Sequence, residues 1–166
     1  MKNKPVRYLT QAGLIAALYI VLTYINPYSF NEVQIRVSEA LCVLPLFTPA
    51  GIPGLFIGCF VANLLHPGVH ILDIIFGSLA TLSAAGLTYF LRKNKFVALM
   101  PPVLINAVVI GLVVFFCYGS ELLLPLTMVS IGVGQLIACY GLGLPLYYAL
   151  KKASFIFGSK ETKTDK

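Results

Sequence analysis

Residues Arg36 to Leu65 read RVSEALCVLPLFTPAGIPGLFIGCFVANLL, and the fold depends on how often this stretch crosses a membrane. The stretch is mostly apolar, and its middle holds the Pro- and Gly-rich sequence TPAGIPG at residues 48–54. Because a membrane-spanning α-helix uses about 20 residues, the length of the stretch does not by itself set the number of crossings. The rest of the chain has to decide it.

The composition predicts an integral membrane protein. Of 166 residues, 58 % are hydrophobic and 11 % are charged, and the mean hydropathy is +0.89. A soluble domain carries roughly 25 % charged residues, so a soluble globular protein is excluded. At about 20 residues for each crossing, the chain has room for six or seven helices and none for a separate soluble domain. Any energy source that needs such a domain is therefore expected in a partner.

The basic residues form short clusters next to apolar runs. These clusters are Lys2, Lys4 and Arg7; Arg92, Lys93 and Lys95; and Lys151 and Lys152 with the tail to Lys166. Short basic clusters beside apolar runs mark the cytoplasmic ends of membrane helices. They do not form the continuous stripe that binds nucleic acid, so no nucleic-acid partner is expected.

Charge parity sets the number of crossings. Clear apolar runs cover residues 8–25, 69–91, 96–117 and 122–150. If Arg7 and Arg92 are both cytoplasmic, an even number of crossings separates them, so residues 36–65 supply zero or two. Two short helices, 36–49 and 52–65, joined by the Pro/Gly-rich turn, fit best. Each of these helices would be only about 21 Å long. They therefore either tilt through a thinned bilayer or form a hairpin packed between longer helices.

The predicted fold is therefore an all-α integral membrane protein with six transmembrane helices. Residues 1–152 form one domain, residues 153–166 form a basic cytoplasmic tail, and both termini lie in the cytoplasm.

Polar side chains within the predicted helices are the candidate substrate-binding residues, because such groups are costly in a membrane and are functional by default. They are Arg36, Glu39, Asn63, Asp73, Asn106 and Gln135. No acidic side chain falls in the inner half of a predicted helix, so the set predicts a pocket open to the outside.

Each candidate also has a structural explanation. Arg36 and Glu39 share one helix face and can pair with each other. Asp73 can cap the amino end of its helix, and the two amides can form interhelical hydrogen bonds.

Two further pairs have two interpretations each. Tyr28 and Phe30, in the loop before Arg36, can stack on a planar ligand as a lid or form an aromatic belt at the interface. Ala12 and Ala16 form a small-x3-small pair that lets a helix approach another closely. The neighbouring residues Gly13 and Ala17 form a second such pair. A pair of this kind packs within the chain or contacts another protein.

Motifs for enzymatic chemistry are absent from the sequence. It has no GxxxxGK[ST] phosphate loop, no HExxH and no GxSxG. The four cysteines include no CxxC pair, so no metal site or disulfide framework is expected. The chain is predicted to be neither an enzyme nor an ATPase, and to hold no cofactor of its own.

Three segments resemble the QueT family of membrane proteins. They are VQIRVSEAL at 33–41, continuing through LP at 44–45; TPAGIPGLFIGC at 48–59; and LDIIFGSLAT at 72–81. The likeness extends from about residue 8 to 152. Members of this family are the substrate-binding S-components of energy-coupling factor (ECF) transporters assigned to queuosine precursors.

The resemblance implies a six-helix S-component in the cell membrane of a prokaryote. It would capture a 7-deazaguanine such as preQ1, preQ0 or queuine from outside. It would then dock on a transmembrane coupling protein with two cytoplasmic ATPases, which use ATP. The family's AxxxA docking motif falls on Ala12 and Ala16. One departure is Gln135, where relatives often carry an acidic residue, so the exact ligand stays open.

Other functions are compatible with the same residues. The chain can be an S-component for another vitamin-like molecule. It can be a stand-alone secondary carrier that uses Asp73 or Glu39 as its proton site, or a purely structural membrane subunit. A deazaguanine fits the polar set because a carboxylate can accept its adjacent N–H donors in a two-point contact.

Overall fold

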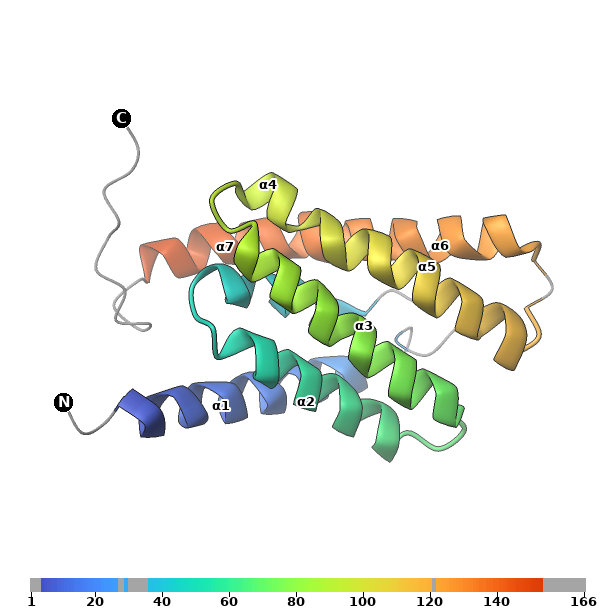
Figure 1. The fold of residues 1–166 in the computed structure, drawn as a ribbon, viewed down its shortest axis with the longest axis horizontal. Coiled ribbons are helices and arrows are strands. Elements are labelled where there is room, and N and C mark those ends of the chain that lie inside the picture. The colour runs from blue at the N-terminus through green and yellow to red at the C-terminus, as the bar shows by residue number, and fades with distance from the viewer. Residues whose placement is uncertain (1–3, 27–28, 30–35, 121, 154–166) are drawn as a thin grey trace.

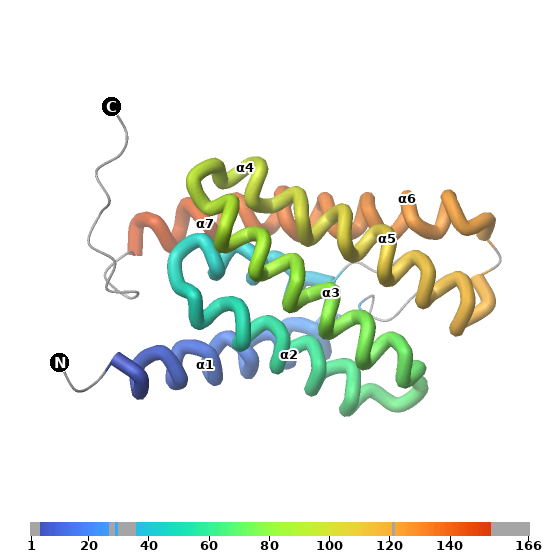
Figure 2. Tube along the Cα trace, in the orientation of Figure 1, coloured from blue at the N-terminus to red at the C-terminus, as the bar shows by residue number. Residues whose placement is uncertain are grey.

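The computed structural model describes residues 4–26, 29, 36–120 and 122–153, and these ranges contain helices and no strand. Figures 1 and 2 show the helices running side by side in one bundle. In chain order the elements are α1 (Lys4–Ile25), η2 (Val37–Leu46), α2 (Gly51–Leu65), α3 (Ile71–Phe90), α4 (Lys95–Ala98), α5 (Met100–Cys117), α6 (Leu124–Leu136), η3 (Ile137–Leu142) and α7 (Gly143–Lys152). The predicted all-helical class is confirmed for the described residues.

Four helical segments are long and apolar enough to cross a membrane: Lys4–Ile25, Ile71–Phe90, Lys95–Cys117 and Leu124–Lys152. Two shorter apolar helices, η2 and α2, complete the bundle. Large apolar side chains such as Leu9, Phe90, Phe116 and Leu123 are more than 70 % exposed. A soluble monomer rarely exposes so much apolar surface, whereas lipid solvates it, so the fold is that of a multi-pass membrane protein.

The second helical segment differs from the predicted α-helix over 36–49. Residues Val37–Leu46 form a 3₁₀ helix, and residues 38–45 are all buried. A 3₁₀ helix rises about 2.0 Å per residue and seldom runs beyond a few residues. Element η2 packs against α1, α2, α3, η3 and α7, and the chain then reverses into α2. The two short helices thus form a hairpin packed between longer helices, the second of the two predicted arrangements.

Element α1 packs closely on α2 through small residues. Ala12 and Ala16 are buried. A Cβ atom on Gly54 would lie 2.9 Å from the Ala12 carbonyl oxygen, and one on Gly58 would lie 3.1 Å from that of Ala16. The two alanines thus face α2 and lie off the open surface of the chain, which explains their size without a partner protein. The neighbouring pair, Gly13 and Ala17, is exposed.

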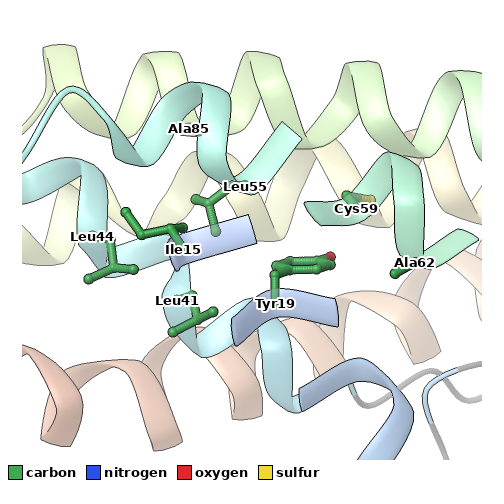
Figure 3. Packing of buried hydrophobic residues seen from close by; sticks show 8 residues of the cluster. All are labelled: Ile15, Tyr19, Leu41, Leu44, Leu55, Cys59, Ala62 and Ala85. Carbon is green, nitrogen blue, oxygen red and sulfur yellow. The ribbon is translucent and has the colours of Figure 1, made fainter. Parts of the chain in front are cut away.

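An apolar cluster fills the space between α1, η2 and α2. Ile15 and Tyr19 of α1 meet Leu55 and Cys59 of α2 and Leu41 of η2 (Figure 3). The cluster holds α1 and the hairpin together on one side of the bundle, and it places the Tyr19 hydroxyl beside η2.

The predicted helix over 122–150 is divided into three parts. Pro125 lies in the first turn of α6, where its missing N–H costs no helical hydrogen bond. Element η3, a π-helical stretch, ends just before Pro145. Proline cannot donate to the carbonyl four residues earlier and its ring crowds that carbonyl, so the widened π turn accommodates Pro145.

The described basic clusters lie at one end of the bundle. The first turn of α1, the turn between α3 and α4, and the last turn of α7 lie at the same end of the bundle (Figure 1). These segments contain Lys4 and Arg7, Arg92 to Lys95, and Lys151 and Lys152. The turns joining α2 to α3 and α5 to α6 lie at the opposite end (Figure 1).

Candidate functional site

All six polar residues predicted for the site are buried, with at most 5 % of each exposed. They come from the start of η2, the end of α2, the start of α3, the middle of α5 and the end of α6. They are Arg36, Glu39, Asn63, Asp73, Asn106 and Gln135. Burial of charged and amide groups among apolar helices has a high energetic cost, so their contacts indicate what holds them there.

Arg36 pairs with Asp73 across the bundle. The Arg36 Nη2 atom lies 4.0 Å from Asp73 Oδ2, and Arg36 Nε donates a hydrogen bond of 3.0 Å to the Ser29 carbonyl. A separation of 4.0 Å is long for a charge-assisted hydrogen bond. This ion pair joins the residue preceding η2 to the first turn of α3.

Glu39 is held by Tyr19, a residue that sequence reasoning missed. The Tyr19 hydroxyl, on α1, donates a hydrogen bond to Glu39 Oε1. Nearby, the hydroxyls of Thr23 and Ser38 hydrogen-bond at 2.8 Å. A fully buried tyrosine normally finds a partner for its hydroxyl, so Tyr19 within an apolar helix was the available signal. Its partner became visible only in the tertiary structure.

Tyr118, which follows α5, connects two elements at the site and was also missed. Its hydroxyl donates to Asp73 Oδ2 at 3.2 Å and accepts the His70 backbone N–H at 2.9 Å. Burial raises the pKa of the Tyr118 phenol, which keeps the hydroxyl protonated as a donor. Tyr118 therefore ties the end of α5 to the start of α3.

The structural role considered for Asp73 as a helix cap is wrong. The cap of α3 is His70, whose Nδ1 accepts the Leu72 N–H at 3.3 Å. Asp73 instead turns its carboxylate inward to Arg36 and Tyr118.

Gly77, one turn after Asp73, packs closely against the acid and leaves little room for a side chain. A Cβ atom there would lie 3.0 Å from Asp73 Oδ1, 3.3 Å from Asn63 Nδ2 and 3.5 Å from Ile110 Cδ1. Asn106 lies one turn before Ile110 on the same face of α5, and both are buried. Asp73 and Asn63 therefore meet at Gly77, and Asn106 lies on the neighbouring helix α5.

Gln135 contacts Cys139, whose thiol also reaches the backbone of η2. The Cys139 thiol lies 3.6 Å from Gln135 Oε1 and 3.8 Å from the Glu39 carbonyl oxygen. The structure thus places Gln135 near the backbone of Glu39.

The predicted stacking residues Tyr28 and Phe30 lie outside the described residues. Within the described part of the chain, no group of three His, Cys, Asp or Glu side chains is placed to hold a metal ion.

The fold and the buried polar set define a class of protein. Ionisable and amide groups that face the interior of a membrane bundle mark sites for polar solutes or ions. A helical membrane protein with such a set is built to bind or move a small polar molecule.

The comparisons identify the family within this class. The family model described as "QueT transporter" matches residues 9–152. The chain therefore belongs to the QueT transporter family. The queuosine precursor transporter QueT of Lactococcus lactis subsp. cremoris (strain MG1363) is 33 % identical over 85 residues. The match covers 49 % of each protein, so the chain spans about half the length of that relative. No solved structure matches the chain.

Proposed function

We propose that this chain is the substrate-binding S-component of an ECF importer. It captures a queuosine precursor, a 7-deazaguanine such as preQ1, preQ0 or queuine, from outside the cell. Its membership of the QueT transporter family and its similarity to a queuosine precursor transporter support the substrate class. The observation that carries the proposal is the buried set of Asn63, Asp73 and Asn106, each of which has a side-chain oxygen without a hydrogen-bond partner.

The chemistry of that set suits a deazaguanine. The lactam edge of the base offers an N–H donor beside a carbonyl acceptor, and a carboxamide offers the complementary acceptor and donors. Asn63 and Asn106 provide two such groups. A planar ring fits between the apolar side chains that line the helices, and the carboxylates can receive the remaining donors.

Ligand binding by the purified full chain tests the proposal. The sequence contains no tryptophan, so isothermal titration calorimetry and mass spectrometry of co-purified small molecules are suitable methods. We expect preQ1, preQ0 or queuine to bind with a 1:1 stoichiometry. Binding of riboflavin or thiamine with none of the three would overturn the substrate assignment and keep the S-component class. Gradient-driven uptake in vesicles without ATP or partner proteins would instead favour a secondary carrier.

The proposed orientation places the basic end of the bundle in the cytoplasm. The Arg36–Asp73 pair and Tyr118 then lie toward the outside, near the turns that join α2 to α3 and α5 to α6. This arrangement would let a solute enter from outside, and both termini would be cytoplasmic.

The proposed partners are a transmembrane coupling protein and two cytoplasmic ATPases, which supply the ATP-driven step. Ala12 and Ala16 are buried against α2. We therefore expect the exposed pair Gly13 and Ala17 to make any close contact between α1 and the coupling protein. Co-purification with a tagged coupling protein tests this contact, and Gly13→Leu should reduce the yield of complex without unfolding the isolated chain.

Adding a methyl group at Gly77 should weaken ligand binding. In the variant Gly77→Ala, the new methyl group would press on Asp73 Oδ1 and Asn63 Nδ2, so we expect affinity to fall by about tenfold or more. The matched control is Gly86→Ala on the same helix, where a Cβ atom meets nothing within 4 Å. Calorimetry should show unchanged affinity for the control. Equal affinities for both variants would place the ligand elsewhere.

A further inference from the structure

The starting observation is the hydrogen-bonding state of the buried oxygens at the site. Asn63 Oδ1, Asp73 Oδ1 and Asn106 Oδ1 have no hydrogen-bond partner in the described structure. All three residues are at least 97 % buried. An unsatisfied buried acceptor has a substantial cost, so we expect donors of a bound ligand to satisfy these three oxygens.

The two oxygens of Asp73 differ. Oδ2 accepts the Tyr118 hydroxyl and faces Arg36, whereas Oδ1 has no hydrogen-bond partner and lies against Gly77. A two-point contact with adjacent N–H donors needs both oxygens of a carboxylate. Because one oxygen is already engaged, Asp73 is suited to a single strong donor. The edge of the base is better matched by the amides, which carry acceptor and donor together.

The buried charges of the site point to a cationic donor. Its described charged side chains are Arg36, Glu39 and Asp73, which are one cation and two anions when all are ionised. Glu39 is hydrogen-bonded by the neutral Tyr19 hydroxyl, and Arg36 lies 4.0 Å from the engaged oxygen of Asp73. One cation cannot balance two carboxylates, so a positively charged ligand would bring the net charge of the site to zero.

We propose that Asp73 Oδ1 receives the protonated aminomethyl group of a 7-deazaguanine, so that the site selects preQ1 over the nitrile preQ0. This inference rests on the proposed function. A nitrile has no N–H to donate, and its nitrogen lone pair would face the carboxylate oxygen. An ammonium group makes a charge-assisted hydrogen bond there, which is among the stronger ones in proteins.

The test compares the two ligands on the full chain in detergent. We expect the unmodified protein to bind preQ1 at least about tenfold more tightly than preQ0, as the loss of one charged hydrogen bond implies. In Asp73→Asn, the preQ1 affinity should fall by about tenfold or more while preQ0 is affected little, so the preference disappears. The control Ser78→Ala removes a hydroxyl that bonds the Ile74 carbonyl of its own helix, and it should keep the preference.

The outcomes separate this inference from the proposed function. If neither deazaguanine binds, the proposed function fails. If preQ0 binds as tightly as preQ1 to the unmodified protein, the inference is overturned and the function stands. If Asp73→Asn still binds preQ1 more tightly than preQ0, Asp73 is not the residue that distinguishes the aminomethyl group from the nitrile. A melting curve checks the fold of each variant, and the comparison on the unmodified protein needs no variant.

Discussion

Replacing Arg36 with methionine is expected to lower the free energy of unfolding by about 3–5 kcal/mol, the usual cost of breaking a buried ion pair from one side. Arg36 is 5 % exposed and its partner Asp73 is 1 % exposed. Methionine fills a similar volume without a charge, so the variant leaves two buried carboxylates without their cation. Thermal melting of the detergent-purified protein measures the loss.

Two further variants make this result specific. Arg36→Met combined with Asp73→Asn should recover part of the lost stability, because the uncompensated charge is removed with its partner. Lys93→Met removes an exposed cation in the turn between α3 and α4 and should change stability by no more than about 0.5 kcal/mol. If Arg36→Met melts at the same temperature as the unmodified protein, the ion pair does not stabilise the fold.

Adding one methyl group at Gly58 is expected to be the second large effect. In Gly58→Ala, the new Cβ would lie 2.7 Å from Tyr19 Cβ and 3.1 Å from the Ala16 carbonyl oxygen. Neither atom is the end of a flexible side chain, so α1 and α2 must move apart. Overpacking of this kind costs about 1–3 kcal/mol. The substitution should also shift Tyr19 and weaken its hydrogen bond to Glu39. Thermal melting measures the loss of stability, and ligand titration measures the effect on binding.

The matched control for Gly58→Ala is Gly13→Ala on α1. A Cβ atom at Gly13 meets nothing within 4 Å, and alanine favours a helix over glycine by about 1 kcal/mol. The control should therefore melt at the same temperature as the unmodified chain or higher. Equal destabilisation by both substitutions would contradict the close packing of α1 on α2.

The hairpin of η2 and α2 connects the packing of the fold to the site. Element η2 packs between α1, α3 and α7, and Arg36 and Glu39 lie at its start. With about three residues per turn in a 3₁₀ helix, residues three apart align on one face. Arg36 precedes η2 with an extended backbone, so it does not share the helix face of Glu39: Arg36 reaches Asp73, whereas Glu39, in the first turn of η2, meets Tyr19.

Much of the architecture could be predicted from the chain alone. The low share of charged residues determines the membrane class, because eighteen charges cannot cover so apolar a surface in water. The apolar runs predict the long helices, and the central motifs identify the family, which the family model confirms over residues 9–152. The cost of burying polar groups in lipid also singles out the six polar residues, and their role in binding stays a prediction.

Only the tertiary structure decided which groups meet and which faces are covered. The pairing of Arg36 with Asp73, and the roles of Tyr19 and Tyr118, join segments far apart in the chain. The same holds for α1, where Ala12 and Ala16 are covered while Gly13 and Ala17 are exposed. In water an amphipathic pattern would reveal the covered face. In a membrane the lipid is as apolar as the protein interior, so hydropathy does not distinguish the two faces. Close packing of small residues decides which face is covered.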